Sequence, residues 1–341
     1  MAPQTSAVNS DNLFIPLVDF SLFLNGTPAE RIQTAQSILH GFQTAGFIYL
    51  KNIPIASETV QETFQTSARF FTRPQAEKDT LAWTTPAANR GYVAHGREKT
   101  STLINKEDVE KLKAQAPDLK ESFEIGREGE EGHPNNWPSS DGEATVFKES
   151  MCGFFAQCKN LHVEVMRAIA VGMGLDEYFF DQYTDVGDNT LRLLHYPSVD
   201  KSVFAANKLQ VRAGEHTDYG SITLLFQDDR GGLQVKSPNG TFVDATPMPG
   251  TVVVNAGDLL ARWSNDTIKS TLHRVVEPKG GKEVDGKYPA RYSMAYFCNP
   301  NFKSFIEAIP GTYGAGAKEP EKKYEGINSH AYLEMRLAAT Y

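Results

Sequence analysis

The stretch AGEHTDYGSITLLF, residues 213–226, contains a histidine and an aspartate two positions apart. On a β-strand, residues i and i+2 project from the same face, so His216 and Asp218 could chelate one ion together. A similar pair, His162 and Glu164, lies in a stretch with helical periodicity, where residues two apart point about 200° away from each other. We therefore expect the first pair to bind a metal and His162 to be a helix-surface or core histidine.

A third ligand is needed, and the candidate is His273 in the β-like run STLHRVVEP. Strands distant in sequence can be neighbours in a sheet. Two neutral imidazoles and one carboxylate on one side of an ion form the facial triad of non-haem Fe(II) oxygenases, which leaves positions open for substrate and O2. Zn²⁺ held by two histidines and a carboxylate is the competing interpretation. These three residues alone leave both metals open.

A second strand-like run, RYSMAYF at residues 291–297, places Arg291, Ser293 and Phe297 on one face. A buried guanidinium needs a partner, and its planar fork beside a hydroxyl suits a carboxylate bound in a bidentate manner. The pair could therefore anchor a dicarboxylic cosubstrate near the metal. The alternative is that Arg291 pairs with an internal acidic residue. Another Arg-x-Ser, at residues 262–264, lies in an expected helix-to-loop segment where the two side chains diverge.

The elements that must position these residues change character along the chain. Helical periodicity marks residues 28–46, 55–82 and, over the longest stretch, 147–174. After it come short β-rich runs separated by turn signals, which are typical of an antiparallel sandwich or barrel. We expect an α+β chain with a mainly β core, in which helices support and bury the β half.

The domain boundaries follow from this pattern. We expect a flexible N-terminal tail over residues 1–12 and an N-terminal region over 13–146. Within that region, the segment 83–146 is rich in Pro, Gly and charge, which indicates loops that could cover a pocket. Residues 147–341 would form a helix, the β core and a closing C-terminal helix near 329–340, all as one structural unit.

Composition limits the classes of partner. The chain has 341 residues, a formal net charge of -8 and 40% hydrophobic residues. No apolar run of membrane-spanning length occurs, and the polar N-terminus lacks an apolar signal core. Three cysteines without a CxxC motif favour a reducing, cytoplasmic setting. Because a negative chain repels a phosphate backbone, we expect no nucleic-acid partner. We also expect no association with a membrane and no obligate protein partner.

The order and spacing of His216, Asp218, His273, Arg291 and Ser293 resemble the 2-oxoglutarate-dependent Fe(II) dioxygenases of the isopenicillin N synthase-like family. The resemblance covers most of the chain and implies a double-stranded β-helix, or jelly-roll barrel, with supporting helices. Further stretches sit where the recurring motifs of that family sit: IPLVDFS, GFQTAGFIYLKN, NRGY, LRLLHYP, HTDYGSITLLFQD, GGLQVK, VVNAGDLLARWSND and HRVVEP.

The resemblance also implies the roles of the site residues. The two histidines and the aspartate would hold Fe(II) as the catalytic centre, and Arg291 and Ser293 would bind the distal carboxylate of 2-oxoglutarate. Tyr196 of LRLLHYP would be a further contact to this cosubstrate. Oxidative decarboxylation with O2 would give succinate and CO2 and drive oxidation of a C–H bond, with ascorbate in support. Family members that do not use 2-oxoglutarate keep the same metal triad, so Arg291 and Ser293 do not settle the cosubstrate alone.

Within the family, longer stretches look like members that oxidise the methyl group of free thymine, as in pyrimidine salvage. The product series would be 5-hydroxymethyluracil, 5-formyluracil and 5-carboxyuracil. The stretches that carry this resemblance are GFQTAGFIYLKNIPI, ANRGY, VMRAIAVGMG, VRAGEHTDYGSITLLFQD, GDLLARWSNDTIKST and IEAIPGTY.

Four residues could bind such a flat, neutral, hydrogen-bonding substrate. Tyr219 and Phe297 could stack on a pyrimidine from two sides, each contributing about 1–3 kcal/mol. Arg192 could donate to a ring carbonyl, and Asn189 offers the donor and acceptor that match an imide edge. Asn189 and Arg192 have opposite strand parity, so either the strand starts after Asn189 or a bulge intervenes.

Other interpretations of the same residues stay open at this stage. Tyr219 and Phe297 could be core aromatics, Arg192 could be half of an internal ion pair, and Asn189 could be a turn residue. A related oxygenase could hydroxylate another small metabolite, such as a nucleoside or a secondary metabolite, because substrate contacts change readily on one scaffold. A catalytically silent barrel that binds a small ligand is the alternative from another class.

Overall fold

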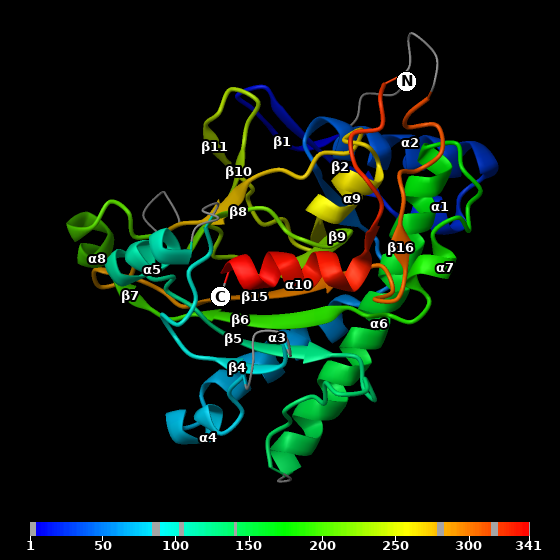
Figure 1. Ribbon diagram of the computed structural model, residues 1–341. Helices are drawn as coiled ribbons and strands as arrows, with labels where there is room; N and C mark the ends of the chain where they lie inside the picture. The colour runs from blue at the N-terminus through cyan, green and yellow to red at the C-terminus, as the bar shows by residue number, and fades with distance from the viewer. Residues whose placement is uncertain are drawn as a thin grey trace.

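The computed structural model describes residues 5–83, 89–101, 106–139, 142–277, 283–314 and 320–340. Its main feature is a nine-stranded sheet that runs through the middle of the molecule (Figure 1). From edge to edge its strands are β1 (Ser6–Ser10), β2 (Leu13–Asp19), β3 (Phe47–Lys51), β12 (Thr251–Ala256), β9 (Ile222–Gln227), β15 (Arg291–Cys298), β6 (Thr190–Tyr196), β5 (Glu121–Gly126) and β4 (Gly91–Val93).

A four-stranded sheet faces the large one and carries part of the site. Its order is β11 (Phe242–Asp244), β10 (Leu233–Lys236), β13 (His273–Val275) and β8 (Ala213–His216). Apolar side chains of both sheets, including Val253 and Val275, share one buried cluster between them. The two sheets form a double-stranded β-helix, as the sequence predicts. Two short ribbons complete the β structure: β7 (Val199–Asp200) with β14 (Lys287–Tyr288), and β16 (Phe305–Ile306) with β17 (Ile327–Asn328).

Helices cover the outer face of the large sheet, where a second and larger apolar cluster lies. In the longest helix, Phe154 packs edge-to-face on Phe226 of β9 at 5.1 Å between ring centroids. The helix that precedes β3 begins with a capping box, in which Thr27 and Glu30 satisfy each other's backbone N–H groups. The helices are α1 (Ser21–Asn25), α2 (Pro28–Thr44), α3 (Ser57–Phe71), α4 (Gln75–Asp79), α5 (Lys106–Gln115), α6 (Gly142–Gly172), α7 (Asp181–Thr184), α8 (Lys201–Ala206), α9 (Asp258–Trp263) and α10 (Ser329–Thr340).

Three details differ from, or refine, the sequence-based expectations. Residues 6–10, expected in a flexible tail, form the edge strand β1, which pairs with β2 and buries Val8 in the same apolar cluster as Leu13 and Ile15. Part of the loop-rich segment 83–146 forms β4 and β5, which extend the large sheet beyond β6. His162 is fully buried in α6 and is a core histidine. Residues 1–4, 84–88, 102–105 and 140–141 lie outside the described part of the chain.

No helix within the described ranges is both long enough and apolar enough to cross a bilayer.

Candidate active site

Two histidines and one aspartate meet where the small sheet opens toward β9. His216 and His273 are direct cross-strand partners on β8 and β13, with ring centroids 4.2 Å apart. Asp218 lies two residues beyond the end of β8, so the chelating pair spans the end of a strand and the start of a loop. Its Oδ1 is 3.9 Å from His216 Nε2 and 3.8 Å from His273 Nε2. One ligand atom from each residue lies within 4.8 Å of the others, close enough for one ion.

Neighbouring groups fix the orientation of all three side chains. His216 Nδ1 lies 2.8 Å from the Gly214 carbonyl and His273 Nδ1 lies 3.1 Å from the Thr271 carbonyl, so both Nε2 atoms face the centre. The other carboxylate oxygen, Asp218 Oδ2, accepts bonds from Thr223 Oγ1 at 2.6 Å and Asn255 Nδ2 at 2.7 Å. Such outer contacts orient metal ligands and leave Oδ1 available.

The protonation states also suit a divalent cation. Burial, and then the nearby His273, lower the pKa of His216 to about 3, so its ring is neutral near pH 7. Burial opposes ionisation of Asp218, but the two histidines and the bonds from Asn255 and Thr223 lower its pKa overall. Two imidazoles and one carboxylate on one side of a shared centre fit non-haem Fe(II).

A small cavity of about 70 Å³ runs from these three residues into the barrel and ends at Arg291. Arg291 is 1% exposed; its guanidinium donates to Ser293 Oγ at 3.0 Å and Gln227 Oε1 at 3.2 Å, and it lies 4.8 Å over the Tyr196 ring. Its Nε has no hydrogen-bond partner, and no ion pair joins it to a carboxylate of the described residues. A buried cation in this state is suited to receive the carboxylate of a ligand.

A second cavity, of about 80 Å³, adjoins the first and is lined by two of the three candidate ligands, His216 and Asp218. Tyr219, Arg192 and Phe297, all predicted from the sequence, line it, and the Arg192 guanidinium lies 5.2 Å over the Phe297 ring. The remaining lining residues are Asn89, Glu98, Thr100, Lys120, Thr190, His216, Thr217, Asp218, Gly220, Asn299, Leu333 and Leu337. The two cavities meet at the candidate metal ligands.

Asn189 lies elsewhere. β6 begins at Thr190, which resolves the parity conflict, and the Asn189 amide points away from the cavity. Its Nδ2 donates to the Tyr296 hydroxyl at 3.0 Å, and its Oδ1 accepts the Asn299 backbone N–H at 2.8 Å. The amide that was predicted to contact an imide edge thus bonds to two residues at the end of β15, and its contact with a substrate stays a prediction.

A buried charge network that was not predicted from the sequence lies behind Arg192. Its guanidinium pairs with Glu124 at 2.6 Å and with Glu98 at 3.4 Å, so it is part of internal ion pairs as well as a cavity wall. Lys120, which lines both cavities, pairs with Glu98 at 2.9 Å. These residues come from the loop-rich segment, where no periodicity identifies a shared face. Thr190 and Asn299 were also missed, although each lies two positions from a predicted cavity residue and shares its parity.

Comparisons with known proteins agree with this geometry. The chain matches the 2OG-Fe(II) oxygenase superfamily over residues 187–300 and the N-terminal region of non-haem dioxygenases in morphine synthesis over residues 15–141. It is 34% identical to the 2-oxoglutarate-Fe(II) type oxidoreductase ppzD of Metarhizium rileyi, over 95% of this chain and 90% of that protein. The chain belongs to the 2OG-Fe(II) oxygenase superfamily and uses iron, 2-oxoglutarate and O2.

Two solved structures are more similar still. Crystal structures of full-length thymine 7-hydroxylase from Neurospora crassa were determined with α-ketoglutarate and either thymine or 5-formyluracil. The thymine complex is 64% identical, with a TM-score of 0.91, and the comparison covers 99% of this chain and 100% of that one. The 5-formyluracil complex is 62% identical, with a TM-score of 0.89 and the same coverage.

Proposed function

We propose that this protein is an Fe(II)/2-oxoglutarate-dependent dioxygenase that oxidises the methyl group of free thymine. The products are 5-hydroxymethyluracil, 5-formyluracil and 5-carboxyuracil, formed in successive turnovers with succinate and CO2. One observation carries the proposal: a buried arginine without a carboxylate partner and an aromatic-walled cavity both adjoin the same His-Asp-His group. The similarity to the Neurospora crassa hydroxylase in complex with thymine and with 5-formyluracil supports both the substrate and the stepwise course.

In this proposal His216, Asp218 and His273 hold the iron. The bound metal, with 2-oxoglutarate and O2, supplies the oxidising chemistry, and the protein supplies position and an enclosed site. Asn255 and Thr223 occupy one carboxylate oxygen of Asp218 and so keep the other directed at the ion.

Arg291, Ser293 and Tyr196 hold the distal carboxylate of 2-oxoglutarate at the closed end of the barrel. In the pairing of β15 with β6, Arg291 lies directly opposite Tyr196, and its guanidinium reaches the Ser293 hydroxyl two positions along the strand. A cosubstrate anchored there extends toward the metal ligands, which line the same cavity. A 2-oxoglutarate carboxylate supplies the partner that the Arg291 guanidinium lacks.

Tyr219 and Phe297 stack on the pyrimidine, and Arg192 donates to a ring carbonyl. The ion pairs of Arg192 with Glu124 and Glu98 hold its guanidinium beside Phe297. Stacking on aromatic faces and a hydrogen bond from a fixed donor stabilise a flat neutral ring in the cavity. Because the ring carries no charge, its binding requires no additional counter-charge. Asn189 acts indirectly, through Asn299, which lines the cavity.

We place the enzyme in a reducing compartment such as the cytoplasm, with a free base as substrate and without a nucleic-acid or obligate protein partner. Three free cysteines, two of them buried, support the compartment. The net charge of -8 and the narrow cavity of about 80 Å³ support a free base over a base within a nucleic-acid chain.

The test is a panel assay with purified protein, Fe(II), ascorbate, 2-oxoglutarate and individual free bases. We expect thymine-dependent succinate release and products that carry one, then more, oxygen atoms by mass. The Phe297→Ala variant should raise the KM for thymine more than the KM for 2-oxoglutarate. Turnover of another metabolite with no oxidised thymine would instead identify a related oxygenase with a different substrate.

A further inference from the structure

The C-terminal helix α10 forms one wall of the thymine cavity. Leu333 and Leu337, one helical turn apart on the same face, line that cavity together with Phe297 and Thr190. Leu337 is 7% exposed, whereas Met335, on the opposite face of the helix, is 55% exposed. In Figure 1 α10 lies across the middle of the molecule, in front of the large sheet. No other helix contributes a side chain to this cavity within the described ranges.

A cationic side chain ties α10 to the loop that carries a metal ligand. Arg336 pairs with the Asp258 carboxylate, and its guanidinium lies 4.4 Å over the Tyr219 ring. Asp258 also accepts a bond from Thr217 Oγ1 at 2.9 Å, and its backbone N–H donates to the Asp218 carbonyl at 2.8 Å. The position of α10 is therefore coupled to the Thr217–Tyr219 segment.

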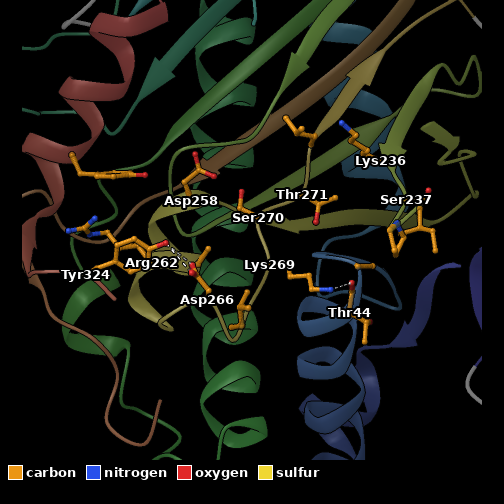
Figure 2. A pocket seen from close by; sticks show the side chains of 17 residues that line it. Thr44, Lys236, Ser237, Asp258, Arg262, Asp266, Lys269, Ser270, Thr271 and Tyr324 are labelled. Carbon is orange, nitrogen blue, oxygen red and sulfur yellow. Dashed lines mark hydrogen bonds between the residues drawn. The ribbon is translucent and has the colours of Figure 1, made fainter. Parts of the chain in front are cut away.

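On its other side, the contact between Arg336 and Asp258 faces a third, more open cavity of about 610 Å³ (Figure 2). Tyr332 and Asp258 line it, together with Arg262, Asp266 and Tyr324. The Tyr332 hydroxyl accepts a bond from Arg336 at 3.2 Å. α10 thus separates a narrow site at the metal ligands from a wide solvent-facing hollow, and Arg336 lies at the boundary.

The start of the helix is fixed. The hydroxyl of Ser329 donates to the Pro300 carbonyl at 3.0 Å, and the Ser329 backbone N–H donates to the Ser304 carbonyl at 2.9 Å. The Asn328 side chain accepts the Ala331 N–H at 3.1 Å and so caps the first turn. Because the anchor is at the N-terminal end, Leu333 and Leu337 are held over the cavity at a fixed height.

The small cavity, of about 80 Å³, suits a single small ring, and Leu333 and Leu337 form part of its wall. From this geometry we infer that Leu333 and Leu337 of α10 are specificity-determining residues that admit the free base and exclude its nucleoside. The Arg336–Asp258 ion pair is the latch that holds this wall closed. The inference rests on the proposed function, and names the element that limits its substrate range.

The test compares thymine and thymidine as substrates of the full-length protein. We expect Leu333→Ala/Leu337→Ala to raise the ratio of thymidine to thymine kcat/KM at least ~10-fold, because removing side-chain volume weakens steric rejection. Met335→Ala, on the exposed face of the same helix, should keep the ratio of the unmodified protein. The milder Leu333→Ala alone should shift the ratio in the same direction, and its thermal midpoint reports whether the fold persists.

The latch is tested separately with Arg336→Gln. We expect a KM for thymine raised ~10-fold or more, an unchanged KM for 2-oxoglutarate, and faster hydrogen exchange of α10 amides. Leucine variants that still oxidise thymine but reject thymidine as the unmodified protein does would overturn the inference. Failure of the unmodified protein to oxidise thymine at all would instead contradict the proposed function.

Discussion

The surroundings of Arg291 give the strongest indication of which ligand the site binds. It is buried, hydrogen-bonded only to neutral groups, and directed into a cavity shared with three candidate metal ligands. Burial of a guanidinium without an ion-pair partner is costly, so such a residue is expected where a ligand supplies the negative charge.

Replacing this arginine therefore gives the first prediction. Arg291→Ala should raise the KM for 2-oxoglutarate about 30-fold or more, because the loss of one partner of a buried charge pair costs about 2 kcal/mol or more. Arg291→Lys should give an intermediate value, since an ammonium group cannot form the two parallel bonds of a guanidinium. Steady-state kinetics with varied 2-oxoglutarate checks this, and an unchanged KM would place the cosubstrate elsewhere.

Glu124 gives a second prediction, about pH. Burial, followed by the charge of Glu98, raises its pKa to about 7, although Arg192, Lys120 and Arg90 act in the opposite direction. The folded protein therefore holds this proton more tightly than the unfolded chain does. This contribution to stability is present at low pH and is lost as pH rises from about 4.5 to about 7.

Urea unfolding from about pH 4.5 to about pH 8 tests this sign. Compared with Glu124→Gln, the unmodified protein should lose free energy of unfolding as pH rises through that window. Glu62→Gln, at an exposed position of α3, is the control and should follow the unmodified protein. Parallel curves for Glu124→Gln and the unmodified protein would contradict the assignment.

At the scale of elements, pairing and register position the site. His216 and His273 meet because β8 and β13 are neighbours, and Arg291 meets Tyr196 because β15 and β6 are neighbours. Alternation along RYSMAYF predicted the shared face of Arg291, Ser293 and Phe297, because side chains two positions apart on a strand point to the same face of the sheet.

Other features were not accessible from sequence spacing. For Asn189 the sequence left open whether the strand starts after it or a bulge intervenes, since the start of a strand is set by tertiary pairing that no local pattern encodes; β6 starts at the next residue. Glu98 and Glu124 lie in a segment without clear periodicity, so their pairing with Arg192 could not be predicted; that of Glu124 depends on β5 joining β6. The closing helix was expected near 329–340. Its role as a cavity wall could not be predicted, because the position of the helix depends on that of β17, the strand directly before it.

The supporting role of α6 leads to a third prediction. Phe154 is 1% exposed and packs on Phe226 of β9, the strand next to β15. Phe154→Ala should lower the free energy of unfolding by about 3–5 kcal/mol, through lost burial and a residual cavity. Val146→Ala, at a position of the same helix that is 52% exposed, should change it by less than ~1 kcal/mol. Denaturant unfolding measures both, and equal effects would contradict the packing role.

For the whole molecule, folding and binding are linked. A ligand that binds only the folded state adds about 2.7 kcal/mol when present at about 100 times its Kd. Anaerobic Fe(II) with 2-oxoglutarate should therefore raise the thermal midpoint, and a chelator should reverse the increase. The stabilisation by 2-oxoglutarate should be largely lost in Arg291→Ala. An equal shift in that variant would show that the cosubstrate does not use this arginine.

The central claim is that one enclosed site joins metal, keto acid and pyrimidine. Its most direct test is anaerobic titration of the protein with Fe(II) and 2-oxoglutarate, followed by visible absorption and then by addition of thymine. We expect a weak charge-transfer band that requires both additions, changes when thymine binds, and is absent in His216→Ala and Asp218→Ala with little loss of fold. His40→Ala, at an exposed position, should keep the band. A band that persists in Asp218→Ala, or one that thymine leaves unchanged, would contradict the shared site.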